Sequence, residues 1–432
     1  MNKKSNSFNF GAKGWVIIIL AFISAYAFSA LMNDSLNITL RYFEATRGLS
    51  QTVLYSFSSI GTVIGVIASV LWGKLMNEKS ATLVWGLASL LIAIFSVVWG
   101  HANSYGVYLL GFLVCQAGVM GSASIGSCAV MNYWFPKKRG LAMGLTTAGF
   151  PLSAATTSLL CNFIIGKAGI TGFYYVIAAI HLVVAIIILI FVRDFPEMRG
   201  AYPDNDKNFN REEADKEFKA GMEYLKNSKW TIGKVFKTKQ TWQVVFGTGI
   251  LSFLAMGIMS NFVNKFSSDY SMPQILGMLA IAGVLAIPGS VLLGFLDVKI
   301  GTKKAAALTY ILGIIAIIFG LTHISVLHYI SLPFLALMLG GSSNFQVSTV
   351  SMIWGRYDFK NAFRVIQPFG TVLGGIGITV VGVIGTSTGY ANAYVTVLIM
   401  AIIGFIVFMT LNLKPIDDDV KKVSEHKLSG KF

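Results

Sequence analysis

Apolar stretches and short polar breaks alternate along almost the whole chain, from Gly14 to Leu413. A helix needs about 20 apolar residues to cross the hydrocarbon core, because backbone groups that face lipid must be hydrogen-bonded within their own helix. The pattern therefore predicts an all-α membrane protein with 12 transmembrane helices. The predicted spans are 14–40, 50–76, 80–100, 105–134, 140–166, 170–192, 241–267, 273–296, 304–322, 327–354, 364–386 and 389–413.

The one long charged interruption divides these spans into two groups of six. We expect an N-terminal tail (1–13), a first six-helix bundle (14–192), a charged linker (193–240), a second six-helix bundle (241–413) and a C-terminal tail (414–432). Within the linker, residues 211–227 predict a surface helix, on which Phe218, Met222 and Leu225 form an apolar stripe at positions i, i+4 and i+7. This stripe could lie against the ends of the spans.

Composition agrees with a membrane protein and gives its orientation. Hydrophobic residues make up 55% of the chain and charged residues only 12%, and the mean hydropathy is +0.68. The net charge of +15 raises the question of a nucleic-acid partner. If both termini are cytoplasmic, only Arg41, Arg47, Lys167 and Lys265 lie outside, which leaves 30 of the 34 Lys and Arg inside. The basicity then reflects topology in the cell (cytoplasmic/inner) membrane, and no nucleic acid is expected.

The sequence offers no pattern typical of an enzyme. Cys115, Cys128 and Cys161 lie in apolar runs without metal-ligand spacing, so they are most simply packing residues. No His, Cys or acidic cluster suggests a metal or nucleophile site. We therefore expect no catalytic activity, no metal and no cofactor.

Polar landmarks recur in the two groups of spans at a nearly constant offset, which indicates repeated halves. The pairs are Gly121-Ser122 with Gly341-Ser342 and Trp134 with Trp354 at 220 residues, Ser69 and Gly73 with Ser290 and Gly294 at 221, and Asp34 and Asn37 with Asn261 and Asn264 at 227. Two related bundles place a ligand site at their interface near the middle of the membrane. This arrangement favours alternating access by rocking of the two halves.

The loop between the eighth and ninth spans resembles the glycine, acid and base loop of major facilitator transporters, with Gly294, Asp297, Lys299, Gly301 and Lys303 as its glycines, acid and bases. The two glycines are seven residues apart, as in that motif, and the acid lies one place early. The N-terminal copy, which begins at Gly73, lacks the usual Asp and second Gly. In that family the loops imply an inside gate, whose helix ends and opposite charges pair in one state and part in the other.

Residues 132–152 resemble the loop and fifth span of monocarboxylate porters and oxalate/formate antiporters, which belong to the same superfamily. The match consists of Trp134-Phe135-Pro136, a basic cluster that ends at Arg139, and the glycines that follow. The resemblance also implies where cations should face a substrate carboxylate, and those positions carry Ser290, Gln367 and Asn33. A carboxylate at mid-membrane would then lack a cationic partner, so a neutral or cationic solute fits better.

Asp34 is the acidic residue that the predicted spans place well inside the membrane, beside Asn33 and one helical turn from Asn37. An ionisable group at that depth is energetically costly and by default marks a substrate or proton pathway. We therefore predict that Asp34 carries the coupling proton and that the two asparagines line the substrate site. The alternative is that the first span ends near Met32 and that Asp34 is a hydrated residue at the helix end.

Further amides are expected to converge on the same site from several spans: Gln116, Asn261, Asn264, Asn344, Gln346 and Gln367. Amides in membrane helices often serve as interhelical hydrogen-bonding groups, so that alternative stays open for each of them.

These features predict a secondary active transporter that moves a small organic solute by alternating access, coupled to protons through Asp34. The alternatives are a carboxylate porter or antiporter, as in the resembled groups, and a non-transporting membrane sensor with the same fold. The expected partners are a small-molecule substrate, protons and the lipid bilayer, and the expected state is a monomer. Symport and antiport are both left open.

Overall fold

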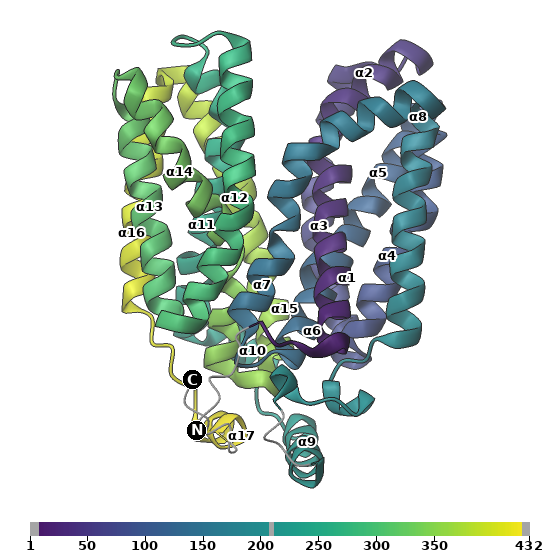
Figure 1. Cartoon of the computed structure of the whole chain (residues 1–432), viewed down its shortest axis with the longest axis vertical. Helices are drawn as coiled ribbons and strands as arrows, with labels where there is room; N and C mark the ends of the chain where they lie inside the picture. The colour runs from purple at the N-terminus through teal and green to yellow at the C-terminus, as the bar shows by residue number, and fades with distance from the viewer. Residues whose placement is uncertain (1–7, 207–210, 426–432) are drawn as a thin grey trace.

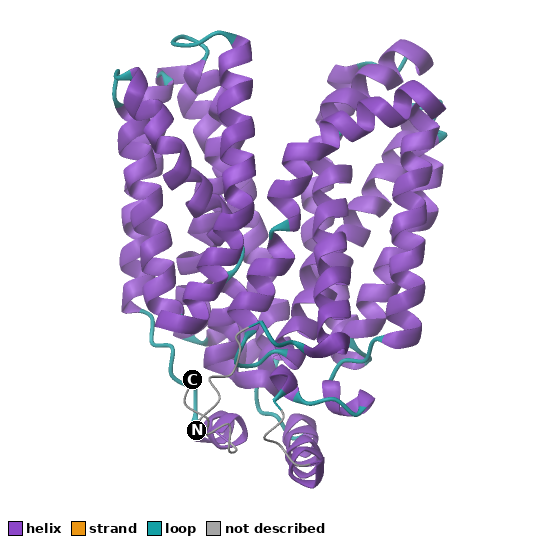
Figure 2. Cartoon of the chain, viewed as in Figure 1, coloured by secondary structure: helices purple, strands orange, loops and turns teal. Residues whose placement is uncertain are grey.

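The computed structural model describes residues 8–206 and 211–425, apart from the side chains of Asn37, Ser59, Ser424 and Glu425. Within these ranges every regular element is a helix (Figure 2). The predicted all-α fold is therefore confirmed. The physical reason lies in the sequence, since a helix satisfies its own backbone hydrogen bonds in an apolar environment.

The first half of the molecule, here called the N half, runs from residue 11 to residue 191. Its elements are α1 (Gly11–Ser29), the π-helix η1 (Ala30–Asp34), α2 (Leu36–Arg47), α3 (Gln51–Glu78), α4 (Ala81–Gly100), α5 (Tyr105–Val119), the π-helix η2 (Met120–Gly126), α6 (Ser127–Trp134), α7 (Arg139–Thr147) and α8 (Gly149–Phe191).

The second half, here called the C half, follows a linker. The linker holds the short helices η3 (Pro196–Arg199) and η4 (Pro203–Asn205), then α9 (Arg211–Lys226) and α10 (Ile232–Lys237). The C half consists of α11 (Lys239–Phe266), α12 (Met272–Ile300), α13 (Thr302–Leu321), α14 (Ser325–Ser342), α15 (Phe345–Thr388) and α16 (Tyr390–Thr410), and α17 (Asp418–Glu425) follows it.

Two glycines explain why the described residues contain ten membrane-crossing segments where twelve spans are predicted. The segments Arg139–Phe191 and Ser325–Thr388 have 53 and 64 residues, far more than one crossing needs. Gly169 (φ 69°, ψ 177°) interrupts α8, and Gly355 (φ 69°, ψ −177°) interrupts α15. Both have positive φ, which glycine adopts without a Cβ penalty. If each of these segments is counted as two crossings, the total is the predicted twelve, which stays a prediction.

The two halves meet at one end of the molecule and diverge toward the other (Figure 1). We call the meeting end, where α9, α10 and α17 lie, the linker end, and the opposite end the far end. Three clusters of buried apolar residues match this shape. One lies wholly in the N half and one wholly in the C half, whereas the third joins both halves and the linker, from Phe10 to Val420.

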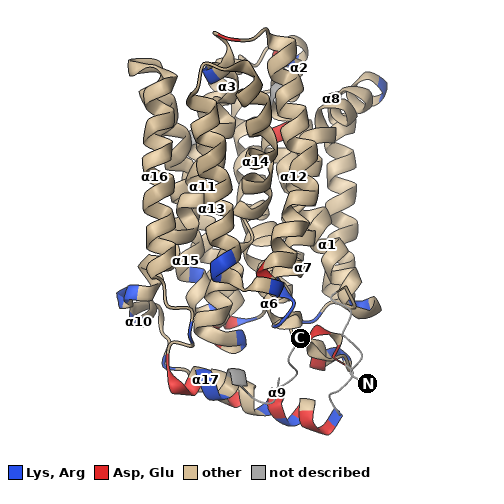
Figure 3. Ribbon diagram, turned by 60° about the vertical axis from the view of Figure 1, so that its left-hand side comes forward, with Lys and Arg blue, Asp and Glu red and all other residues tan. Residues whose placement is uncertain are grey.

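Charged residues gather at the linker end and are sparse along the helices between the two ends (Figure 3). By the positive-inside rule this end is expected to face the cytoplasm. The stripe predicted on α9 packs as expected, since Phe218, Met222 and Leu225 lie against the apolar cluster that joins the halves.

Candidate functional site

Asp34 ends the first membrane-crossing segment, in the π-helical turn η1. Single π-turns inside helices occur frequently at functional sites. The partly buried Asp34 carboxylate accepts a hydrogen bond from Ser153 Oγ of α8 at 2.6 Å, and the Asp34 backbone carbonyl accepts one from Ser158 Oγ at 3.3 Å. Both partners belong to the N half, so these contacts fix Asp34 within one half.

A chain of hydroxyl groups leads away from this carboxylate. Ser153 Oγ lies 2.9 Å from Thr157 Oγ1, which donates to Tyr26 Oη at 3.4 Å, and Tyr26 Oη lies 2.9 Å from Thr156 Oγ1. Ser153 and Thr157 share one face of α8 because they are four residues apart. A hydroxyl can both donate and accept, so this chain has the composition of a proton relay. The sequence analysis missed these hydroxyls, since serine and threonine are common in membrane helices.

The residues predicted beside Asp34 are placed as follows. The Asn33 side chain is exposed, and the Asn37 side chain lies outside the described residues. Asn264, its counterpart in the repeat, is exposed near the end of α11. Asn261 is buried and donates to the carbonyls of Gly257 and Ile378, at 3.0 and 3.3 Å, so it hydrogen-bonds α11 to α15.

A second group of predicted residues meets where α7 of the N half contacts the C half. Thr147 Oγ1 lies 2.7 Å from Ser290 Oγ and donates to Asn344 Oδ1 at 2.5 Å. Ser290 Oγ also donates to the Gly144 carbonyl at 2.9 Å. All three side chains are buried. Ser290 and Asn344 therefore contribute to a polar contact between the halves, and Thr147 is the partner that the sequence analysis missed.

The predicted glutamines form two smaller groups. Gln346 lies against Gly370 of α15, where a Cβ would be 2.5 Å from Gln346 Nε2. Gln367 donates to Thr371 at 3.1 Å, and its buried Oε1 has no hydrogen-bond partner among the described residues. Gln116 lies against Gly65 of α3, where a Cβ would be 3.0 Å from Gln116 Nε2. An unpaired buried carbonyl is costly, which makes Gln367 Oε1 a candidate ligand contact.

The predicted gate loops pack where the halves meet. A Cβ on Gly140 would collide with the carboxylate of Asp297, and a Cβ on Gly294 would collide with the Gly140 carbonyl. Asp297 is buried and accepts hydrogen bonds from Thr302 and Ser348, both at 2.5 Å. The close approach of α7 and α12 therefore depends on two glycines facing each other.

The remaining residues of the predicted gate loops have separate contacts, within one half or between the two. Gly73 faces Arg364 of the C half, where a Cβ would be 2.7 Å from Arg364 Cβ. Arg139 donates to the Pro136 carbonyl. Gly301 has a φ of 88° and follows α12. Lys299 is exposed above the Phe295 ring, and Lys303 donates to the Leu411 carbonyl at 3.1 Å within the C half.

The basic loop before α7 is held by a linker carboxylate. Asp204 accepts hydrogen bonds from the backbone N–H groups of Lys137 and Lys138, at 3.0 and 2.8 Å. Burial raises the pKa of the Asp204 carboxyl, and these N–H donors and the two lysine charges offset part of that rise. Burial likewise lowers the pKa of Lys138, against the opposing effect of Asp204.

An ion pair that the sequence analysis missed connects the halves at the linker end. Arg356 of α15 forms two parallel bonds to Glu197 of η3, at 2.7 and 2.8 Å, and donates from Nε to the Tyr133 carbonyl at 2.8 Å. The side chain of Glu197 is only 4% exposed and that of Arg356 12%. The neighbouring Phe195 stacks on Tyr133 of α6, with ring centroids 4.4 Å apart, and on Tyr357 of α15, with ring centroids 5.8 Å apart. Arg199 of η3 donates to the Ile190 carbonyl of α8 at 2.6 Å, so η3 is attached to the N half.

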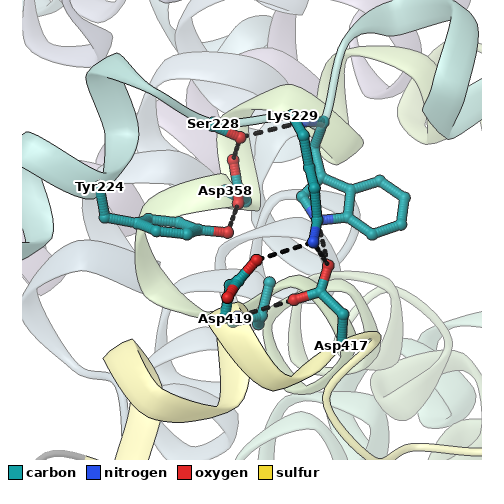
Figure 4. Close-up of polar contacts among 8 residues, drawn as sticks. Tyr224, Ser228, Lys229, Asp358, Asp417 and Asp419 are labelled. Atoms are coloured by element: carbon teal, nitrogen blue, oxygen red, sulfur yellow. Dashed lines mark hydrogen bonds and ion pairs between the residues drawn. The ribbon is translucent and has the colours of Figure 1, made fainter.

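Further polar contacts join the linker to α15 of the C half and to the C-terminal segment (Figure 4). Tyr224 and Ser228 each donate to the Asp358 carboxylate at 2.5 Å. Lys229 pairs with Asp419 at 2.7 Å and with Asp417 at 3.3 Å. The first two contacts tie the end of α9 and the residues after it to α15, and Lys229 ties the start of α17 to the linker.

Comparison with known proteins identifies the family. A family model described as the Major Facilitator Superfamily matches residues 17–357, most of the chain. The chain belongs to the major facilitator superfamily. Membership confirms the resemblance drawn from the gate loops, and transporters of this family sit in membranes and carry small molecules.

Curated relatives of this family member include transporters. An oxalate:formate antiporter of Oxalobacter formigenes is 26% identical over 299 residues, which cover 64% of this chain and 62% of the antiporter. The chain thus matches less than two thirds of that relative's length. An uncharacterised transporter of Mycobacterium tuberculosis is 28% identical over 151 residues, which cover 34% of this chain and 33% of the relative.

Solved structures share the fold of this major facilitator protein. A proton:xylose symporter bound to 6-bromo-6-deoxy-D-glucose superposes with a TM-score of 0.75 at 14% identity, covering 95% of this chain and 99% of the symporter. A human organic anion transporter gives a TM-score of 0.67 at 14% identity, covering 91% and 98%. At this identity the likeness shows the fold alone.

Proposed function

We propose that this major facilitator protein is a secondary active transporter of a small organic solute, coupled to protons through Asp34. The observation that carries the proposal is the bond from Ser153 to the Asp34 carboxylate, at the head of a hydroxyl chain that reaches Tyr26. A carboxylate with such partners has a route along which a proton can move. Membership of a transporter family supports the rest of the proposal.

The coupling follows from where the carboxylate lies. The halves are joined at the linker end by one shared apolar cluster and diverge at the far end. Closing the far end would bring apolar helix faces over Asp34 and exclude water. An ionised carboxylate in such surroundings is costly, so the closure is favoured once a proton or a cationic solute neutralises it. Rocking between the two states then moves the proton bound to Asp34 and the solute across the membrane together.

A carboxylate substrate is the second candidate, and the antiporter relative favours it. Ser290, at a position where the resembled groups have a cation, is engaged between Thr147 and Gly144. Proton movement therefore distinguishes a solute that travels with protons from a carboxylate that exchanges without them.

The test uses proteoliposomes that contain the full-length protein and a trapped pH-sensitive dye. D-xylose, choline, oxalate and formate are added outside one at a time, and solute-dependent acidification of the lumen is measured. We expect Asp34→Asn to slow the proton movement at least about tenfold, because the amide cannot carry the proton. The control is Asp269→Asn, which changes an exposed acid in the turn that follows α11.

The possible results distinguish the proton-coupled transporter from the carboxylate antiporter and the sensor. An Asp34→Asn protein that moves protons with solute at the wild-type rate would refute the coupling. Uptake of labelled oxalate into formate-loaded proteoliposomes without proton movement would support the carboxylate antiporter. A solute that raises the melting temperature of the purified protein but gives no flux would support the sensor.

A further inference from the structure

A cavity of about 350 Å³ lies at the linker end, apart from the Asp34 site. The N half lines it with Lys79 and Thr82, the start of the linker with Arg193, the linker helix α9 with Met222 and Leu225, and α15 of the C half with Lys360. The volume falls in the range of small-molecule sites. The cavity is therefore a place where one ligand could touch both halves and the linker.

The charges on the lining select an anion. Lys79, Arg193 and Lys360 line the cavity together with a single acid, Asp194. The Asp194 carboxylate is occupied by the backbone N–H groups at the start of α4, from Ala81 at 3.0 Å and from Thr82 at 2.8 Å. Arg193 Nη1 in turn donates to the carbonyls of Leu189, Ile190 and Val192. The lining still carries three cations and one acid, so its net charge is positive. Cations that converge on a pocket favour carboxylate or phosphate oxygens.

The rest of the lining supplies a second indication. It is largely apolar, with Leu83, Leu189 and Met198 together with the stripe of α9. A ligand with an anionic head and an apolar body fits both features.

We propose that this cavity binds an organic phosphate, with the phosphate between Lys79, Arg193 and Lys360 and the apolar body against Met222 and Leu225. The source is a soluble phosphate ester or a lipid headgroup, which offer the same chemistry. Lys360 already donates to the Asn77 carbonyl of α3 at 3.2 Å, across the two halves. A bound phosphate adds a second link there, so it holds the linker end closed. This regulatory part rests on the proposed function, whereas the binding does not.

The test measures binding without transport. Full-length protein in neutral-lipid nanodiscs is titrated with phenyl phosphate, with inorganic phosphate or with phenol, and its thermal unfolding is followed. Phenyl phosphate is expected to raise Tm in a saturable way, and phenol is expected to leave Tm unchanged. Lys79→Gln and Lys360→Gln should each weaken binding at least about tenfold, as expected when one charge-assisted bond is lost. Lys74→Gln, an exposed lysine of α3 outside the cavity, is the matched control.

Nanodiscs that contain an anionic phospholipid distinguish the two sources. If the lipid headgroup is the ligand, they raise Tm and suppress the phenyl phosphate response. If the ligand is soluble, the response is the same in both nanodiscs. The proposal is overturned if neither phenyl phosphate nor anionic lipid gives a saturable shift that Lys79→Gln and Lys360→Gln weaken. Loss of proton coupling in the proteoliposome assay would leave this result untouched.

Discussion

Replacing Glu197 by Gln should shift this major facilitator protein toward the state that is open at the linker end. Glu197 and Arg356 form a buried pair between η3, which is attached to the N half, and α15 of the C half. Opening of the linker end would separate the two residues and give both to water. The substitution therefore penalises the closed state, where the arginine charge stays buried, much more than the open state.

The size of the shift follows from the geometry. Removing one partner of a buried ion pair costs about 3–5 kcal/mol. Gln can still accept one of the two bonds, at 2.7 and 2.8 Å, that Glu197 accepts, so the lower value of about 3 kcal/mol is the better estimate. At 1.36 kcal/mol for each factor of ten, this changes the ratio of closed to open protein by about 150-fold. A protein that is closed about 100 to 1 would become an almost equal mixture.

Double electron–electron resonance between spin labels measures this change. Lys74 and Lys299 are exposed residues of the two halves at the linker end, and Lys167 and Ser387 are exposed residues of the two halves at the far end. The three native cysteines are buried, which favours selective labelling of introduced ones. In Glu197→Gln we expect a longer distance to appear at the linker end and a shorter one at the far end.

The control is Glu223→Gln, which neutralises an exposed glutamate of the same linker. Both distance distributions should then match those of the unsubstituted protein. Unchanged distributions in Glu197→Gln would refute the idea that this pair holds the halves together. A collapse of both distributions would indicate unfolding and would refute it equally.

Three further substitutions test the closed interface and the linker. Gly144→Val should favour the open linker end in the same distance measurement, because a Cβ there would lie 2.5 Å from the Ser290 carbonyl. Thr147→Val should lower the thermal stability, since Asn344 loses a buried donor at a cost of about 1–3 kcal/mol, whereas Thr52→Val, at an exposed position of α3, should not. Burial raises the pKa of the Asp204 carboxyl, so the ionised form of this carboxyl is less favourable in the folded protein than in the unfolded chain. The stability of the unsubstituted protein should therefore fall relative to Asp204→Asn as pH rises through that pKa, which melting curves at about pH 4.5 and about pH 7.5 would detect. An equal difference at both pH values would contradict this.

The apolar runs of the sequence were sufficient to predict the class of fold and most segments, because each membrane helix is specified by its own composition. The repeated landmarks predicted two related halves, and the loop motifs predicted the family. Boundaries between adjacent helices were harder to predict where a single glycine, Gly169 or Gly355, reverses the chain inside an otherwise continuous apolar helix.

The partners of individual polar residues could not be predicted, because they depend on how helices far apart in the chain pack together. Ser290 and Asn344 were expected at the substrate site, and they meet Thr147 where the halves touch. Asn261 was expected there too, and it bonds within the C half. Only the tertiary structure connects Asp34 to Ser153 and Arg356 to Glu197, pairs separated by more than a hundred residues. The sequence by itself determined which segments enter the membrane, since that depends on local hydrophobicity. The tertiary structure decided which polar groups face one another, since that depends on the rotation and crossing of every helix.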